Sequence, residues 1–258
     1  RQGEGAAAEG APRRRHEAPP REVLCQDALP WLEALPPGGL PQGSCVITGI
    51  PDIHEVDSDG QMGLEGWSKW FQRAVELSLR ALPDGGVAIF MQTDIKASRG
   101  DEHRHRASGG HYWEWVDKAH LAIVAAQRRP GARLLWHKVA FSGSLSGGGR
   151  NSNVAGYTHL LCFTAGGDPE PVDRLPFPDV LRKGLSTWMS GSGAHVTERL
   201  CAYVRARGCT QVVDPFCGEG AVLAVANALG MGAVGVELCK KRARMARELD
   251  GEELLAAD

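Results

Sequence analysis

The residues best suited to chemistry lie near the carboxyl end of the chain, in the segment 212–220 (Val-Val-Asp-Pro-Phe-Cys-Gly-Glu-Gly). This pattern predicts a strand, a tight glycine turn and then a helix over 221–229. Gly218 and Gly220 lack side chains where the backbone must bend sharply or approach a ligand closely. The first N–H groups of the following helix have no partner within the helix. Glu237 ends the next predicted strand, where an acid can accept hydrogen bonds from ribose hydroxyls. The spacing alone therefore predicts a nucleotide-binding βαβ unit.

The charge of this turn restricts the ligand further. Asp214 and Glu219 place negative charge where a phosphate-binding loop would need to be neutral or positive. Phosphates are therefore disfavoured, and an adenosine ligand without phosphates fits better.

A second group of polar residues follows the predicted buried strand 45–48. The loop Gly49-Ile50-Pro51-Asp52 comes first, and four ionisable residues follow it. These are His54, Glu55, Asp57 and Asp59. Asp52, or less favourably His54, could serve as a general base toward a hydroxyl or a ring nitrogen. The alternatives are that Asp52 caps the loop and that His54 is an ordinary surface residue.

A third group mixes basic and aromatic residues in the segment 99–115. Arg104, Arg106, Tyr112 and Trp113 are the candidate substrate-binding residues, because basic side chains contact phosphates and aromatic rings stack on bases. The alternative is that the tryptophans are core residues and the arginines form a solvated rim. His103, His105 and His111 resemble metal ligands, but they lie in a flexible segment among arginines, so we expect no metal site.

Composition sets the limits for these sites. The chain has 258 residues, a formal net charge of −2 and 43% hydrophobic residues, which indicates a globular protein and excludes a histone-like binder. No apolar run is long enough for a membrane span. Seven cysteines occur without any C-x-x-C pair, which predicts reduced thiols, no disulfide framework and an intracellular location in cytoplasm or nucleus, with an organelle not excluded.

The elements that must position these residues alternate along the chain. Seven apolar runs read as buried strands: 23–25, 45–48, 87–91, 134–139, 157–163, 211–214 and 233–237. Helical patterns lie between them, at 67–81, 121–127 and 196–207, and a further helix is expected after Glu237. This alternation predicts an α/β fold with a mostly parallel sheet, helices on both faces and an antiparallel pair (134–163) at one edge.

Domain organisation is simple. Residues 1–20 are rich in Ala, Gly, Pro and Arg and predict a basic, solvated tail, or the remnant of a targeting signal. Residues 21–258 predict a single domain. The chain begins at Arg1 rather than Met, which leaves room for an upstream segment carrying targeting information.

The segment 214–220 resembles the D-P-F-x-G-x-G motif of S-adenosylmethionine-dependent amino-methyltransferases that act on nucleic acids. Other pieces resemble that family in its permuted order, with the cofactor motif on the carboxyl side of the catalytic loop. These pieces are 24–32, 44–52, 67–92, 134–138, 157–163 and 184–204. The resemblance covers roughly residues 22–247 and implies a Rossmann-like, seven-stranded class I methyltransferase fold.

The resemblance also implies roles for individual residues. Asp214, Phe216, Gly218 and Gly220 would line the methionine and ribose side of S-adenosylmethionine, with Glu219 inside the same motif. Glu237 would bind the ribose hydroxyls, and Asp27 would lie at the adenine. Core packing is the alternative for Phe216, and a solvated strand end is the alternative for Glu237.

The catalytic loop departs from the family pattern, which is [Asp/Asn/Ser]-Pro-Pro-aromatic. Only Pro51 is kept, Gly49 or Thr48 stands at the polar first position, and Asp52 replaces the stacking aromatic. Three interpretations stay open. In the first, the enzyme acts on a different acceptor atom, with Asp52 as the general base. In the second, it remains an amino-methyltransferase that uses Thr48 or Asp52, and the flipped nucleobase stacks on Trp67, Trp113 or Tyr112. In the third, the protein is an inactive partner subunit.

The acceptor is the least constrained part of the prediction. The chain shows no large insertion resembling a DNA target-recognition domain, which favours an RNA recognised by its shape, or recognition by a protein partner. We therefore expect a methyltransferase that acts on a nucleic acid, RNA rather than DNA. A small-molecule methyltransferase and an inactive partner subunit are the alternatives.

Overall fold

The computed structural model describes residues 19–96, 115–142, 156–166, 178–187 and 191–258. Three predictions fall outside this range: the tail, most of the glycine-rich loop 142–149, and the substrate-binding candidates Arg104, Arg106, Tyr112 and Trp113.

A single eight-stranded sheet forms the centre of the molecule. Its strands, in chain order, are β1 (Arg21–Leu24), β2 (Ser44–Thr48), β3 (Val87–Gln92), β6 (Arg133–Phe141), β7 (Tyr157–Thr164), β8 (Val180–Arg182), β9 (Gln211–Asp214) and β10 (Gly232–Val236). Across the sheet the order is β1-β10-β9-β2-β3-β7-β6-β8. Only β7 runs against the others, because it pairs antiparallel with both β3 and β6 while the remaining pairs are parallel. A small separate pair consists of β4 (Ile95–Lys96) and β5 (Trp115–Val116).

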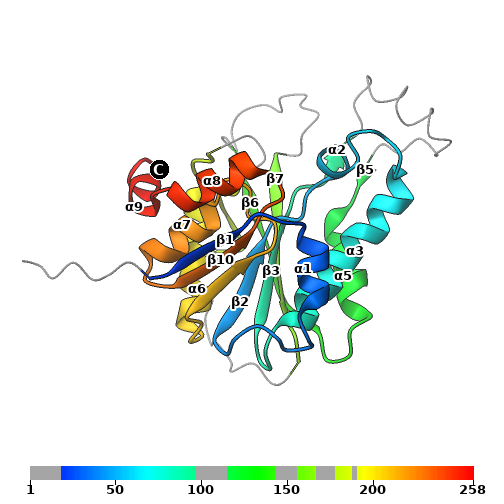
Figure 1. Cartoon of the computed structure of the whole chain (residues 1–258), viewed down its shortest axis with the longest axis horizontal. Helices are drawn as coiled ribbons and strands as arrows, with labels where there is room; N and C mark the ends of the chain where they lie inside the picture. The colour runs from blue at the N-terminus through cyan, green and yellow to red at the C-terminus, as the bar shows by residue number, and fades with distance from the viewer. Residues whose placement is uncertain (1–18, 97–114, 143–155, 167–177, 188–190) are drawn as a thin grey trace, which may run out of the picture.

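Helices cover both faces of the sheet (Figure 1). On one side lie α1 (Ala28–Ala34), α3 (Gly63–Ala81) and α5 (Lys118–Gln127). On the other lie α6 (Ala194–Ala206), α7 (Ala221–Ala228), α8 (Lys240–Glu248) and α9 (Gly251–Ala256). The four-residue helix α2 (Ile53–Val56) sits near the end of the sheet where the parallel strands finish.

The core is divided by the sheet into two layers. In β3, Ile89 and Met91 face the layer of α6 and α7, whereas Ala88 and Phe90 face the layer of α3 and α5. All six residues of β3 are buried, as expected for a central strand covered on both faces. The continuous apolar runs of the sequence follow directly from this double covering.

The seven predicted strands and all of the predicted helices are confirmed, with ends shifted by a few residues. The antiparallel pair is confirmed as β6 and β7, but the sheet continues one strand further. β8 pairs parallel with β6 and forms the edge itself. It is only three residues long and two of them are exposed, so it lacks the apolar run that marks a buried strand.

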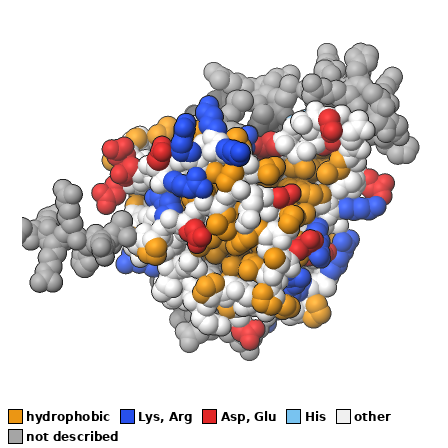
Figure 2. Space-filling view, viewed as in Figure 1, with side chains coloured by type: hydrophobic (Ala, Val, Ile, Leu, Met, Phe, Trp, Pro, Cys, Tyr) orange, Lys and Arg blue, Asp and Glu red, His pale blue; other side chains and the backbone are white. Residues whose placement is uncertain are grey.

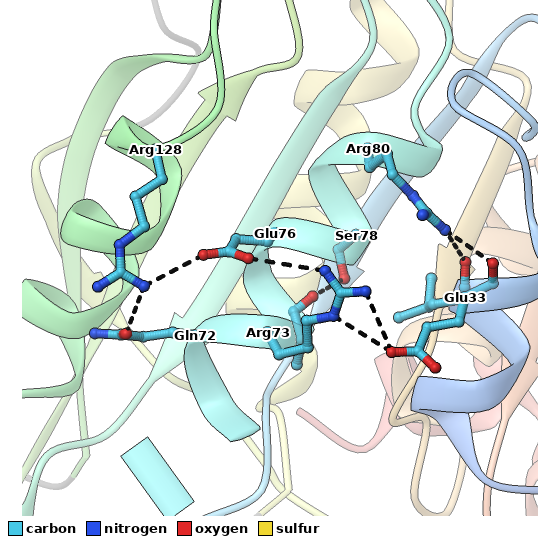
Figure 3. A network of polar contacts seen from close by, with 9 residues as sticks. Glu33, Gln72, Arg73, Glu76, Ser78, Arg80 and Arg128 are labelled. Carbon is cyan, nitrogen blue, oxygen red and sulfur yellow. Dashed lines mark hydrogen bonds and ion pairs between the residues drawn. The ribbon is translucent and has the colours of Figure 1, made fainter. Parts of the chain in front are cut away.

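The helices on the α3 side are joined by arginines (Figure 3). Arg80 donates from one nitrogen to three carbonyl oxygens at the end of α1, those of Leu32 (2.8 Å), Glu33 (3.1 Å) and Leu35 (2.9 Å). The last carbonyls of a helix lack the usual partners within it, and here that of Leu32 also accepts locally, from the Leu35 N–H (3.3 Å). Arg80 therefore caps α1 from the neighbouring helix. Arg73 and Arg128 add exposed ion pairs with Glu33 and Glu76, which contribute little individually.

The topology brings chemistry-bearing residues to one edge. Parallel strands β1, β10, β9 and β2 end beside one another, so the residues that follow them share the carboxyl edge of the sheet. Because β7 is antiparallel, its beginning also lies there, with His159 opposite Gln92 at the end of β3. Among the described helices we find none with the length and apolar character needed to cross a bilayer.

Candidate cofactor and acceptor site

The turn between β9 and α7 is built on two glycines in the left-handed region. Gly218 has φ 54° and Gly220 has φ 87°, conformations that side chains disfavour. Gly220 is also confined, since a Cβ there would lie 2.6 Å from the Cα of Ala246 in α8. The turn is tied to β10 by a hydrogen bond from the Cys217 N–H to the Val236 carbonyl (3.0 Å). The backbone of this turn is thus fixed by packing as well as by its own geometry.

Glu237 lies directly after β10 with its carboxylate held across this turn. One oxygen accepts from the N–H of Gly218 (3.1 Å) and the other from the N–H of Cys239 (2.7 Å). The side chain is half-buried. Each carboxylate oxygen can accept a second hydrogen bond, so Glu237 is oriented in advance while it keeps capacity to bind hydroxyls.

Asp214 ends β9 and is 3% exposed. Its Oδ1 accepts from the Thr48 hydroxyl (2.6 Å) and from the Phe216 N–H (3.1 Å). Burial raises the pKa of Asp214 to about 7, and the nearby charge of Glu237 adds to the rise, although the two hydrogen bonds oppose it. A cation bound beside this carboxyl would favour its charged form.

Thr48 ends β2, the strand next to β9, and is completely buried. Its hydroxyl donates to Asp214 and so supports the carboxyl of the neighbouring strand rather than facing an acceptor. The contact joins the first position of the predicted catalytic loop to the predicted cofactor motif.

The loop after β2 leads into the short helix α2, and Asp52 is its N-cap. Oδ1 of Asp52 accepts from the N–H groups of His54 (2.9 Å) and Glu55 (3.3 Å), and Glu55 accepts in return from the Asp52 N–H (3.2 Å). This reciprocal arrangement is a capping box. The loop-capping role considered for Asp52 is therefore present, and it uses only one of the two carboxylate oxygens.

Two buried side chains hold the loop from beneath. The Lys118 Nζ donates to the Ile50 carbonyl (2.9 Å), and the Trp67 Nε1 donates to the Pro51 carbonyl (3.4 Å). Trp67 is fully buried and packs against Phe71 at 5.3 Å between ring centroids. The prediction that Trp67 could stack on a flipped base is wrong, because its ring is buried in the core layer between α3 and the sheet rather than exposed at the surface.

The remaining predicted cofactor residues lie at the same edge. Asp27 follows β1 and caps α1, accepting from the Leu29 N–H (3.0 Å). Phe216 is half-buried, with its ring 5.6 Å from that of Trp70 in an edge-to-face arrangement. Glu219 lies in the glycine turn and is half-buried. Asp27, Thr48, Asp214, Phe216 and Glu237 are thus brought to one end of the sheet.

A polar cluster that the sequence argument missed surrounds Asp94, just after β3. One of its oxygens accepts from Trp115 Nε1 (3.1 Å), His159 Nε2 (3.2 Å) and the Tyr157 hydroxyl (3.3 Å). Its other oxygen accepts from the N–H of Lys118 (3.0 Å). Asp94, Asp117 and His159 lie close enough for a metal ion, but these donors already use the Asp94 carboxylate. The cluster is better explained as a brace for α5.

Lys118 itself was also missed, although the sequence holds a signal for it. Lys118, Ala122 and Ala125 recur at helical spacing and are all buried, so the lysine lies on the apolar face of α5. A lysine on such a face needs a specific partner. Its partner, the Ile50 carbonyl, is 68 residues away in the chain and could not be inferred from local spacing.

The surface beside the cofactor edge is uneven in character. Figure 2 shows basic side chains gathered in the region where Figure 1 places α8, and apolar side chains exposed across the middle of the same face. Lys240, Lys241 and Arg244 are the exposed basic residues of α8 near its start. They follow Glu237 closely and so form a positive rim beside the glycine turn.

Comparison with known proteins supports the fold through structure alone. No protein-family model matches the chain, and no curated protein sequence matches it. The solved structures that match include the complex with S-adenosyl-L-methionine of TTHA0409, a protein of Thermus thermophilus described as a putative DNA modification methylase. The TM-score is 0.62 at 20% identity, over 91% of this chain and 94% of that one.

Two further solved structures agree. The PvuII DNA methyltransferase, described as cytosine-N4-specific, matches with a TM-score of 0.65 at 11% identity, over 93% of this chain and 91% of that one. The complex of M1.HpyAVI with S-adenosylmethionine matches with a TM-score of 0.52 at 13% identity, over 88% of this chain and 98% of that one. The chain therefore has the Rossmann-like fold of the class I methyltransferases, and the predicted resemblance to the amino-methyltransferases is confirmed at the level of the fold.

Proposed function

We propose that this protein binds S-adenosylmethionine and transfers its methyl group to a nucleic acid. The observation that carries the proposal is the rigid glycine turn after β9, with the Glu237 carboxylate fixed across it by the Gly218 N–H. A turn of this form offers close backbone approach and a pre-oriented acceptor for ribose hydroxyls.

The charges of the turn suit this cofactor better than a nucleotide phosphate. S-Adenosylmethionine carries a cationic sulfonium and an amino group but no phosphate. Asp214 lies beneath the turn with a raised pKa, and a neighbouring cation would lower that pKa again. The edge also offers half-buried apolar side chains against which an adenine could pack, namely Leu29 at the start of α1 and Phe216 in the turn after β9.

The position of the loop after β2 suits the transfer step. Methyl transfer is an in-line displacement in which the acceptor atom forms a bond to the methyl carbon while the bond from carbon to sulfur breaks. Positioning the two reactants supplies much of the rate. The loop begins where β2 ends, beside β9, and the Thr48–Asp214 bond joins the two strand ends. Asp52 is the candidate base for an acceptor that must lose a proton.

The acceptor is proposed at the level of nucleic acid. RNA is the sequence-based prediction, whereas the solved structures of similar fold include proteins described as DNA methylases or methyltransferases. A protein partner that helps to select the substrate is part of the same proposal. All seven cysteines are free thiols, which supports an intracellular location.

The first experiment measures cofactor binding by calorimetry. Glu237→Gln should weaken S-adenosylmethionine binding by roughly 10- to 100-fold, because hydrogen bonds to a charged group are worth about 1.5–3 kcal/mol. Glu248→Gln, an exposed glutamate at the end of α8, is the matched control and should bind as wild type does. Failure of the wild-type protein to bind would overturn the proposal.

The second experiment follows labelled methyl groups from S-adenosylmethionine into separated RNA, DNA, protein and small-molecule fractions of a cell extract. Label in RNA or DNA supports the proposal and identifies the acceptor. Label confined to small molecules or protein would replace the acceptor class. Cofactor binding without transfer into any fraction would favour the inactive partner subunit.

A further inference from the structure

Lys118 is a buried cation at the base of the acceptor loop. It is 4% exposed, although lysine is rarely buried to this extent. Among the described residues its Nζ forms no ion pair within 4.0 Å, and it donates a hydrogen bond to the Ile50 carbonyl (2.9 Å). The rings of Trp67 and Phe71 lie 5.9 Å and 5.6 Å from Nζ, within reach of a cation–π attraction.

The backbone of Lys118 is fixed independently of its side chain. Asp94 accepts from the Lys118 N–H (3.0 Å), and Asp117 caps the same first turn of α5 through the His120 N–H (2.8 Å). Asp94 is itself held by three donors from β5 and β7. The point from which the lysine reaches toward the loop is therefore rigid.

The loop that it reaches has little local support. It lies between the last residue of β2 and the four-residue helix α2. Its consecutive carbonyls, those of Ile50 and Pro51, accept from Lys118 and Trp67. Both anchors come from helices on the α3 side, so tertiary contacts determine where the loop lies relative to β9.

We propose that Lys118 is a positioning residue, which fixes the loop Gly49–Asp52 so that an acceptor meets the methyl group of the cofactor. This role rests on the proposed methyl transfer. A methionine at this position would fill the same space without the cost of burying a charge. What it could not do is donate a hydrogen bond to the Ile50 carbonyl, so this bond is what the buried lysine provides. We expect the positive charge to give a stronger bond than a neutral donor could.

The charged groups that face Lys118 explain how it stays protonated. Burial lowers the pKa of Lys118 to about 8, while Asp52 and Glu55 from the α2 side and Asp94 from the end of β3 oppose that change. Trp67 and Phe71 from α3 carry no charge. The lysine is therefore charged below about pH 8 and loses its charge above it, so the anchor should weaken as pH rises through that value.

The test compares Lys118→Met with wild type and with Lys69→Met, which removes an exposed lysine from α3. Amide hydrogen exchange should become faster in residues 49–56 of Lys118→Met and stay unchanged in the turn 217–221. Turnover should fall on the order of 10- to 100-fold, with the dissociation constant of S-adenosylmethionine unchanged. Lys69→Met should match wild type in all three measurements.

Two results would overturn the proposal: unchanged exchange in the loop, or faster exchange with unchanged turnover. If Lys118→Met does not fold, the wild-type protein is measured at pH 7 and pH 9, and protection of residues 49–56 should fall relative to residues 217–221. A wild-type protein that transfers no methyl group contradicts the proposed function, whereas the exchange data still decide whether Lys118 holds the loop.

Discussion

The turn after β9 and the loop after β2 lie at the ends of neighbouring strands, yet they are held in place in different ways. The turn after β9 is defined by its own backbone, with Gly218 and Gly220 in left-handed conformations and Glu237 bonded to the Gly218 N–H. The loop after β2 is held by side chains from α3 and α5, through Trp67 and Lys118.

This difference separates two tasks at one edge. A constant cofactor can be bound by a rigid backbone whose geometry few sequences can form. An acceptor site built on a loop held by distant side chains can change its chemistry without disturbing the cofactor turn. The chain follows that division, since the glycine motif is intact while the loop Gly49–Asp52 departs from the usual pattern.

The largest expected effect comes from Gly220→Ala. The left-handed φ costs about 1–2 kcal/mol for a side-chain residue, and the added Cβ would lie 2.6 Å from the backbone of Ala246. We expect Tm to fall by about 6–12 °C and binding of S-adenosylmethionine to be lost in calorimetry.

Gly230→Ala is the matched control for that prediction. Gly230 also has a left-handed φ (78°), but no atom lies within 4 Å of its added Cβ. Its Tm should fall by only about 2–4 °C, with cofactor binding retained. Equal effects of the two substitutions would show that the contact with α8 does not define the cofactor turn.

On the acceptor side the largest effect is expected on turnover. Asparagine caps helices as well as aspartate does, so Asp52→Asn should keep Tm and cofactor affinity. It should lower turnover by about 100-fold if the carboxylate is the base. Asp52→Ala removes the cap as well and should lower Tm by about 2–4 °C. Full turnover in Asp52→Asn would leave Asp52 with the capping role alone.

The contrast between the two regions also explains what could be predicted from the sequence. The strands were visible because β3 and its neighbours are buried on both faces, and the glycine turn because its residue types and spacing are local. The role of Asp94 and the partners of Lys118 and Trp67 were not visible, because each of these contacts joins segments that are distant in the chain. β8 was missed because it has only three residues, of which one is buried and two are exposed, so it leaves no apolar run.

A smaller effect, about 10-fold on cofactor affinity, is expected from Asp214→Asn. In wild type the affinity for S-adenosylmethionine should rise between pH 6 and pH 8, because the cation binds the ionised carboxyl whose pKa is about 7. Asp214→Asn should bind S-adenosylmethionine more weakly than wild type at pH 8, and its affinity should lack the rise that ionisation of Asp214 contributes. The amino group of the ligand titrates in the same way with both proteins, so the difference between the two calorimetric series reports Asp214 alone.

The same substitution should stabilise the ligand-free protein. The folded pKa of Asp214 lies above its ordinary value, so the folded state holds the proton more tightly than the unfolded state. Stability is then lost as pH rises from about 4 through about 7. Asp214→Asn should exceed wild type in Tm at pH 8 and by less at pH 6. A Tm of Asp214→Asn below that of wild type at pH 8 would contradict a raised pKa of Asp214 in the folded protein.

The smallest effect, about 3-fold on affinity, is expected where the two regions touch. Thr48→Val removes the hydroxyl that donates to Asp214 (2.6 Å). Without that donor the charged carboxyl is less stable, so the midpoint of the pH dependence of cofactor affinity should move upward. Thr164→Val removes another fully buried hydroxyl, one that donates to the Gly166 carbonyl at the opposite end of the sheet, and should leave the midpoint unchanged. If the midpoint does not move in Thr48→Val, the end of β2 does not affect the pKa of Asp214, and the loop after β2 and the turn after β9 are then independent.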